Sequence, residues 1–169
     1  MPAKKLTIMA LFIAISFIGS NITVFGTIAF DSLPAFLAAL LLGPWYGAAI
    51  GFLGHIFTAL TSGFPLSIPL HMVIAAGMAG TMLGFGFSYR ALTGKIPEKY
   101  NLTVTGVIGI ILNSPVTLAL SVFALAAMAG REAALGLIIL LPFLTVTSAV
   151  NVAVAIALFL VLRKVWWKV

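Results

Sequence analysis

The chain has 169 residues, of which 63% are hydrophobic and only 7% are charged, and its formal net charge is +6. Soluble domains carry roughly 25% charged residues, so this composition excludes a soluble globular protein. The lack of cysteine excludes disulfide scaffolds, thiolate metal sites and cysteine nucleophiles. Two histidines and three acidic residues argue against metal clusters and acid–base enzymes, and the small basic clusters do not form a nucleic-acid-binding stripe. We therefore expect one membrane-embedded domain over 1–169, without metal or cofactor.

The uncharged segments set the number of membrane spans. A span needs about 20 apolar residues, and 6–30, 100–130 and 133–162 each fit one helix. The segment 32–89 would be about 87 Å long as a helix at 1.5 Å per residue, so it holds two long or three short spans. Three spans there give six in total and place eight basic residues on one side, against Arg131 beside Glu132 on the other. Two spans give five in total and place six basic residues on one side of the membrane and three on the other. The positive-inside rule therefore predicts six spans with both termini in the cytoplasm. The eight cytoplasmic residues are Lys4, Lys5, Arg90, Lys95, Lys99, Arg163, Lys164 and Lys168.

Turn-forming residues place the helix boundaries. In chain order, we predict helices over about 5–24, 32–43, 45–61, 68–89, 102–128 and 136–163. Pro34 and Pro69 lie near helix starts, where a missing N–H costs nothing, and Gly43-Pro44 forms an inner turn. The outer loops are 25–31 and 62–67, and the inner loop 90–101 holds most of the charge. After the last helix, Trp166 and Trp167 suit an interfacial aromatic belt.

Two features of this layout have competing interpretations. The second helix is about 18 Å long in a hydrocarbon core of roughly 30 Å, which is tolerated if protein covers its end or if it lines a cavity. Lys4-Lys5 before an apolar run also resembles a signal peptide. However, we find no small-x-small cleavage site followed by a polar mature domain.

Polar side chains follow one face of each of three predicted spans. His55, Thr58 and Ser62 have i, i+3, i+7 spacing; Asn113, Thr117 and Ser121 have i, i+4, i+8 spacing; Thr147 or Ser148 with Asn151 forms a shorter stripe. In the six-span topology these stripes lie between the membrane centre and the outer side, near Asp31 and His71. Polar groups inside a membrane mark function by default, and a channel would need them through the full depth. The pattern therefore predicts a pocket that opens outward, with these substrate-binding residues: Asp31, His55, Thr58, Ser62, His71, Asn113, Thr117, Ser121, Ser148 and Asn151.

Each type of polar residue also has a structural interpretation. Serine and threonine can bond carbonyls of their own helix, and asparagine can join two helices. Asp31 can cap the helix that begins at Ser32, His55 can be a packing residue, and His71 can face lipid headgroups. Pro115 removes one helical hydrogen bond near the predicted pocket floor.

The small residues and methionines indicate how the helices pack against one another. The GxxxG pairs and the alanine pair allow close helix approach, and the methionines are interpreted as gap fillers rather than copper ligands. These are Gly47/Gly51, Gly80/Gly84, Ala10/Ala14, Met72, Met78 and Met82.

Four features of the sequence resemble one family of membrane proteins. They are the length with the six-span layout, Ala10-Leu11-Phe12-Ile13-Ala14, the segment 31–48 (DSLPAFLAALLLGPWYGA) and Asn151-Val152-Ala153. The first of these segments resembles an AxxxA motif of the first helix, the second a pattern across the second and third helices, and the third a last-helix pattern. The segment across the second and third helices is the most specific. By these features the whole chain resembles the substrate-binding S components of energy-coupling factor (ECF) vitamin transporters.

The resemblance implies a mechanism and partners. S components of prokaryotic plasma membranes bind a micronutrient on the outer side and dock on a transmembrane T component driven by two ABC ATPases, and they are thought to topple in the membrane. Ala10 and Ala14 would form the docking face. The chain has no GxxxxGK[ST] motif for ATP binding, so the energy must come from a partner.

The resemblance also bears on the substrate. The segment 54–71 is more similar to S components assigned to α-ribazole, a piece of cobalamin, than to the riboflavin, thiamine or biotin members. One acid and one exposed arginine in the outer half disfavour a polyanion, so a neutral, aromatic, hydroxyl-rich molecule fits better. A nickel or cobalt member would be expected to have an N-terminal histidine, which Met1-Pro2-Ala3 does not supply.

Two other function classes stay open. A stand-alone small transporter or scaffold is one alternative. The other is an intramembrane hydrolase using His55 or His71 with Asp31 and a serine, but the serines lack a Gly-x-Ser-x-Gly context. We therefore do not expect an enzyme.

Overall fold

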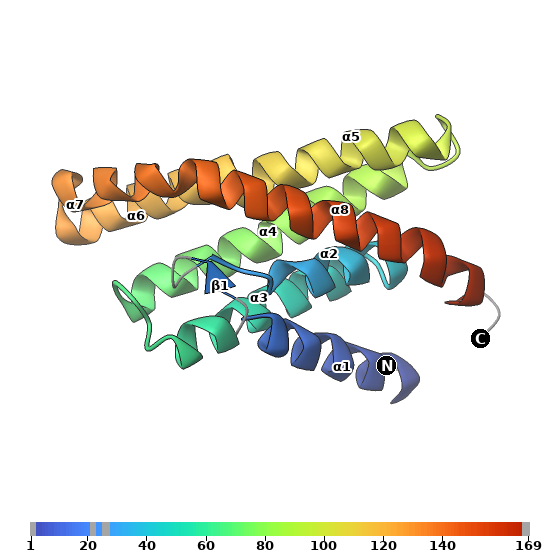
Figure 1. Cartoon of the computed structure of the whole chain (residues 1–169), viewed down its shortest axis with the longest axis horizontal. Coiled ribbons are helices and arrows are strands. Elements are labelled where there is room, and N and C mark those ends of the chain that lie inside the picture. Colours follow the sequence, from blue (N-terminus) through green and yellow to red (C-terminus); the bar gives the residue numbers. More distant parts are fainter. Residues whose placement is uncertain (1–2, 21–22, 25–27, 167–169) are drawn as a thin grey trace.

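The computed structural model describes residues 3–20, 23–24 and 28–166. Six helical rods in this part of the chain form an elongated bundle (Figure 1). Four rods are single helices: α1 (Ala3–Ser20), α2 (Ser32–Leu41), α3 (Pro44–Thr61) and α4 (Ile68–Leu92). The fifth rod joins α5 (Glu98–Ile111), η1 (Leu112–Val116) and α6 (Thr117–Ala129), and the sixth joins α7 (Arg131–Leu135), η2 (Gly136–Leu140) and α8 (Leu141–Trp166). The predicted all-α fold with six helices is confirmed.

The first helix ends earlier than predicted. α1 stops at Ser20, and a two-residue antiparallel pair, β1 (Thr23–Val24) and β2 (Ile28–Ala29), follows where the sequence predicted helix to 24 and then loop. The Ser20 hydroxyl bonds the carbonyl of Phe17 at 2.6 Å, a local bond that competes with helix continuation. A Cβ added at Gly19 would lie 2.6 Å from the carbonyl oxygen of Phe30, so the chain ahead of α2 closely contacts this end of α1.

The helices on both sides of the inner loop and the sixth rod extend beyond their predicted ends, whereas α2 ends at Leu41 rather than at 43. α4 continues to Leu92 and α5 begins at Glu98, so the predicted inner loop 90–101 shrinks to 93–97. The sixth rod begins at Arg131 rather than 136, because Gly130 at φ +90° turns the chain directly from α6 into α7. Helix 136–163 was therefore predicted too short, with its first turns missed.

The proline inside the fifth rod has the local effect that the sequence predicted. Pro115 lies in η1, a π-helical turn between two α-helical segments. The Thr117 hydroxyl donates a hydrogen bond to the carbonyl oxygen of Leu112 at 2.8 Å. A carbonyl of this irregular turn is therefore satisfied by a side chain of the same rod.

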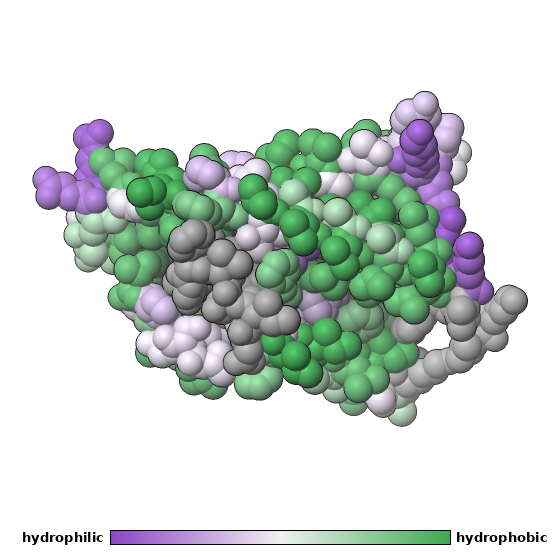
Figure 2. Space-filling model, viewed as in Figure 1, coloured by the Kyte–Doolittle hydropathy of each residue, from purple (hydrophilic) through white to green (hydrophobic). Residues whose placement is uncertain are grey.

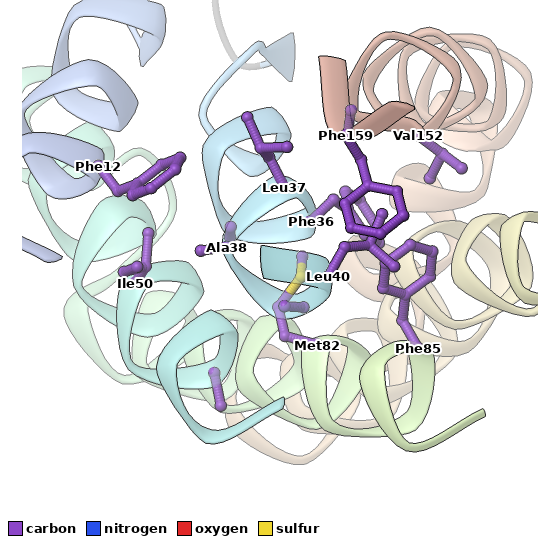
Figure 3. Packing of buried hydrophobic residues seen from close by; sticks show 14 of the residues in the cluster. Phe12, Phe36, Leu37, Ala38, Leu40, Ile50, Met82, Phe85, Val152 and Phe159 are labelled. Carbon is purple, nitrogen blue, oxygen red and sulfur yellow. The ribbon is translucent and has the colours of Figure 1, made fainter. Parts of the chain in front are cut away.

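Helix α2 lies in the centre of the bundle. Its residues 34–40 are all buried, and Figure 3 shows Phe36, Leu37 and Leu40 among side chains of neighbouring helices. The Phe36 and Phe85 rings meet edge to face with centroids 4.9 Å apart. A helix that is apolar all round belongs in a protein interior. The short second helix is thus covered by protein, as the sequence required for its length.

The outer surface is that of a membrane protein. Large apolar side chains are exposed along the rods, among them Phe123 at 79% and Ile139 at 74%. In Figure 2 the visible surface is mostly hydrophobic, and the most hydrophilic residues gather at the two ends of the molecule. The segments Ile68–Leu92, Glu98–Ala129 and Arg131–Lys164 are long and apolar enough to cross a membrane, and Lys5–Ser20 and Ser32–Leu41 are shorter apolar helices.

One end of the bundle carries most of the basic residues. The start of α1, the α2–α3 turn, the loop 93–97 and the end of α8 all lie at this end, here named the basic end (Figure 1). The loop 62–67 and α7, with Arg131, lie at the opposite end. This arrangement matches the predicted even number of crossings. Lys168, Trp167 and the Trp166 side chain fall outside the described part of the structure.

Candidate functional site

A cavity lies between α2, α3, α4 and the fifth and sixth rods, in the half of the bundle away from the basic end. Its volume is about 170 Å³, on a scale where one water molecule takes roughly 10–15 Å³. It therefore has room for a small organic molecule. We name it the substrate cavity, and its polar lining consists of Asp31, Ser32, His55, His71, Asn113, Thr117, Ser121, Thr147, Ser148 and Asn151.

The two histidines meet although they are 16 residues apart. Nε2 of His55 and Nδ1 of His71 are 3.1 Å apart, and the rings stack with their centroids separated by 5.3 Å. Nε2 of His71 lies 2.8 Å from the carbonyl oxygen of Pro65. Because a carbonyl only accepts, this nitrogen of His71 donates, and Nδ1 of a neutral His71 then accepts from His55. The contacts thus fix the orientation of both rings at one wall of the cavity.

Asp31 continues this chain of polar contacts. Its Oδ2 lies 3.6 Å from Nδ1 of His55 and accepts a hydrogen bond from the Thr58 hydroxyl at 2.9 Å. Asp31 occupies the N-cap position of α2, but it has helical backbone angles and its side chain makes no capping bond. The capping interpretation is therefore wrong, since the carboxylate turns to α3 instead.

Two asparagines form the opposite part of the polar lining. The side-chain amide of Asn113 donates to the Ser148 hydroxyl at 3.1 Å, and that of Asn151 donates to the Ser32 hydroxyl at 2.7 Å. Their carbonyl oxygens are buried and have no hydrogen-bond partner. A buried polar atom without a partner costs about 1–3 kcal/mol. The two oxygens are thus unsatisfied acceptors on side chains that line the cavity.

The π-helical turn helps to build this region. Asn113 lies inside η1 and Thr117 directly after it, and the Ser114 hydroxyl bonds that of Thr145 at 2.7 Å. This contact ties the turn to α8, which carries Ser148 and Asn151. Single π-helical turns occur often at functional sites.

The rest of the lining is apolar, and sequence reasoning did not find it. Its side chains come from the start of α4, from α6, from η2 and from the start of α8: Leu70, Ile74, Met78, Leu118, Leu137, Leu140 and Leu144. Pro65 and Leu66 of the loop 62–67 complete the lining. In that loop Phe64 has φ 51° and Leu66 has φ 76°. Such angles are uncommon outside glycine and occur often at functional sites.

The structure brings most of the predicted site residues together. Eight of them line the substrate cavity: Asp31, His55, His71, Asn113, Thr117, Ser121, Ser148 and Asn151. Thr58 lies behind the lining and bonds Asp31. Ser62 is exposed at the C-terminal end of α3 and lies apart from the cavity, because the helix ends there and the next residues turn away.

The lining also limits which ligands fit. Among the described residues of the lining, Asp31 is the only acidic one, and none is a lysine or arginine. Across the described residues, no group of three or more histidine, cysteine or acidic side chains is arranged to hold a metal ion.

The alanine pair of the first helix lies on the surface. Ala10 and Ala14 are exposed on α1 and are not enclosed by the bundle.

The sequence model of the family described as "ECF transporter, substrate-specific component" matches residues 4–163. The chain belongs to this family. As an ECF substrate-specific component it is a membrane protein that binds the substrate of a transporter, and its family is not one of enzymes. No curated protein sequence matches the chain significantly.

Proposed function

We propose that the chain captures a neutral, aromatic, hydroxyl-rich micronutrient in the substrate cavity, and that α-ribazole is its substrate. The ligand enters from the outer side, while the basic end faces the cytoplasm. The chain then docks through Ala10 and Ala14 on a T component driven by two ATPases. The observation that carries the choice of ligand is a cavity whose described lining has one carboxylate, no lysine or arginine, and two amide oxygens without a hydrogen-bond partner.

The hydrogen-bonding groups of the cavity favour a ligand that donates. The hydroxyls of Thr117 and Ser121 already donate to helix carbonyls, at 2.8 Å in each case. The free carbonyls of Asn113 and Asn151 and the Asp31 carboxylate remain as acceptors. Ribose hydroxyls supply several donors, and a buried phosphate or carboxylate would lack a cationic partner.

The apolar half of the cavity favours a ring system. Leucine, isoleucine and methionine side chains line the side formed by α4, η2 and α8. A benzimidazole ring would remove apolar surface from water against these side chains, which stabilises binding by roughly 25 cal/mol per Å². A ligand with one apolar ring and one hydroxyl-rich sugar thus matches both halves of the cavity.

Matched ligands test the proposal on the purified chain. We expect α-ribazole to raise the unfolding temperature and its 5′-phosphate, which adds an unpaired anion to the same molecule, to leave it unchanged. Riboflavin, thiamine and biotin serve as comparison ligands. Equal stabilisation by the phosphate, or stabilisation by an anionic vitamin alone, would show that the proposed ligand class is wrong.

Single substitutions locate the binding site. Asn113→Ala, Asn151→Ala and His55→Ala should each weaken ligand binding about 5- to 150-fold, because each leaves a ligand group unsatisfied at about 1–3 kcal/mol. Ser62→Ala is the matched control, since Ser62 follows the same helical stripe as His55 but lies outside the lining. It should bind within about threefold of wild type. If all three cavity variants bind like wild type, the ligand lies elsewhere.

A further inference from the structure

A second cavity lies at the basic end, on the far side of α2 from the substrate cavity. It has a volume of about 340 Å³, and its lining comes from α2, the α2–α3 turn, α4, α8 and the residue after α4. We name it the basic-end cavity. Its lining residues are Leu40, Leu41, Gly43, Tyr89, Arg90, Thr93, Phe159 and Arg163.

The basic-end cavity carries an excess of positive charge. Arg163 forms an ion pair with Glu98, and the Tyr89 hydroxyl donates to the same carboxylate oxygen at 3.4 Å. Arg90, in contrast, forms no ion pair with any described residue. The guanidinium of Arg163 is thus already paired, whereas that of Arg90 is exposed and accessible to an anion from outside the chain.

The α2–α3 turn places the Arg90 guanidinium. A Cβ added at Gly43 would lie 2.1 Å from an Nη atom of Arg90, so the guanidinium lies directly against this turn. Gly43 also has φ +115°, a conformation that side chains rarely adopt. Arg90 lines the cavity, where the fork of N–H donors on its planar guanidinium can bind two oxygens of one phosphate.

Neighbouring aromatic residues place this cavity at the depth of lipid headgroups. Trp45, two residues after Gly43, is 68% exposed, and Lys5 lies 5.7 Å from the centre of the Tyr46 ring. Tryptophan and tyrosine beside basic residues are typical of the membrane–water interface. The cavity also has apolar side chains, Leu41 and Phe159 among them. A free inorganic anion has no apolar group that could contact these side chains, whereas a phospholipid has its glycerol and acyl chains.

We propose that the basic-end cavity binds an anionic phospholipid, with its phosphate on the Arg90 guanidinium and its glycerol and upper acyl chain against Leu41 and Phe159. Basic pockets between membrane helices are known to hold such headgroups. The site is separate from the substrate cavity and does not depend on which micronutrient the chain captures.

Titration of the purified chain in dodecyl maltoside tests the site. The probes are phosphatidylglycerol, phosphatidylcholine and inorganic phosphate, and the readout is the unfolding temperature. We expect phosphatidylglycerol alone to stabilise the chain. Arg90→Gln should weaken its binding about tenfold or more, since a charge-assisted hydrogen-bond pair is lost. Lys95→Gln removes the same charge from the exposed loop at the same end, and it should bind within about twofold of wild type.

A second variant covers the case in which Arg90→Gln does not fold. Arg90→Lys keeps the charge but loses the fork, and we expect severalfold weaker binding of phosphatidylglycerol. Equal losses in the Arg90→Gln and Lys95→Gln variants would mean unspecific attraction to a basic surface and overturn the proposal. Stabilisation by inorganic phosphate to the same degree would assign the cavity to a soluble anion. Binding by the Arg90 variants at wild-type strength would also refute the lipid site.

Discussion

Replacing an exposed alanine of α1 by tryptophan should separate ligand binding from transport. Ala10 and Ala14 lie one turn apart on α1 and are exposed. No described residue of α1 lines the substrate cavity. Two alanines at this spacing let a second helix approach closely. We therefore expect Ala10→Trp or Ala14→Trp to block docking on the T component and to leave the cavity intact.

The size of the effect follows from packing. Forcing a larger side chain into a close-packed contact costs typically about 1–3 kcal/mol, which weakens docking roughly 5- to 150-fold per tryptophan. Ligand binding by the purified variants should stay within about threefold of wild type, a difference of about 0.7 kcal/mol. Copurification with the T component and vitamin uptake by cells that hold the whole complex measure the first effect, and ligand titration measures the second.

A matched control removes the effect of tryptophan itself. Ala157 is exposed on α8, which packs on α2 and α5, whereas α1 packs on α3 and α2. Ala157→Trp should therefore leave uptake and copurification unchanged. Normal uptake with tryptophan at both positions of α1 would refute the docking face. Joint loss of ligand binding and thermal stability would instead assign the alanines to internal packing.

Two further predictions concern topology and helix packing. In this cysteine-free chain, Lys95→Cys should react with a membrane-impermeant thiol reagent only from the inside, and Arg131→Cys from the outside; reaction of position 95 from outside would end the six-span topology. Gly47→Ala would bring a Cβ to 2.6 Å from that of Ala39 and should destabilise the chain by about 1–3 kcal/mol. Gly80→Ala meets nothing within 4 Å and should be neutral or stabilising by up to about 1 kcal/mol. Thermal unfolding compares the two glycine variants, and equal unfolding temperatures would contradict the packing argument.

The helical stripes were readable from the sequence because they depend on local spacing alone. Asn113, Thr117 and Ser121 follow one face of one rod, so their common position at the cavity follows from the helical period. The same reasoning placed Ser62 at the pocket, and this is wrong because α3 ends before that residue. Periodicity predicts a face, but it does not say where the face stops.

Contacts made by loops could not be predicted in this way. His55 and His71 meet because the loop 62–67 returns the chain tightly from α3 to α4, with φ values at Phe64 and Leu66 that no composition rule indicates. The apolar lining could not be predicted either. In the sequence, the leucines of η2 cannot be distinguished from leucines that face lipid, and only the start of the sixth rod at Arg131 places them at the cavity. Tertiary placement decides which apolar residues line a cavity.

The shortness of α2 explains where the substrate cavity lies. Ten residues span about 15 Å, roughly half of the hydrocarbon core. The helix begins deep in the bundle, so the space beyond its start is left to α4 and the fifth and sixth rods. Asp31 and Ser32, at that start, line the cavity, and no later residue of α2 does. The short length of α2, which fitted the predicted six spans worst, is therefore what leaves room for a ligand.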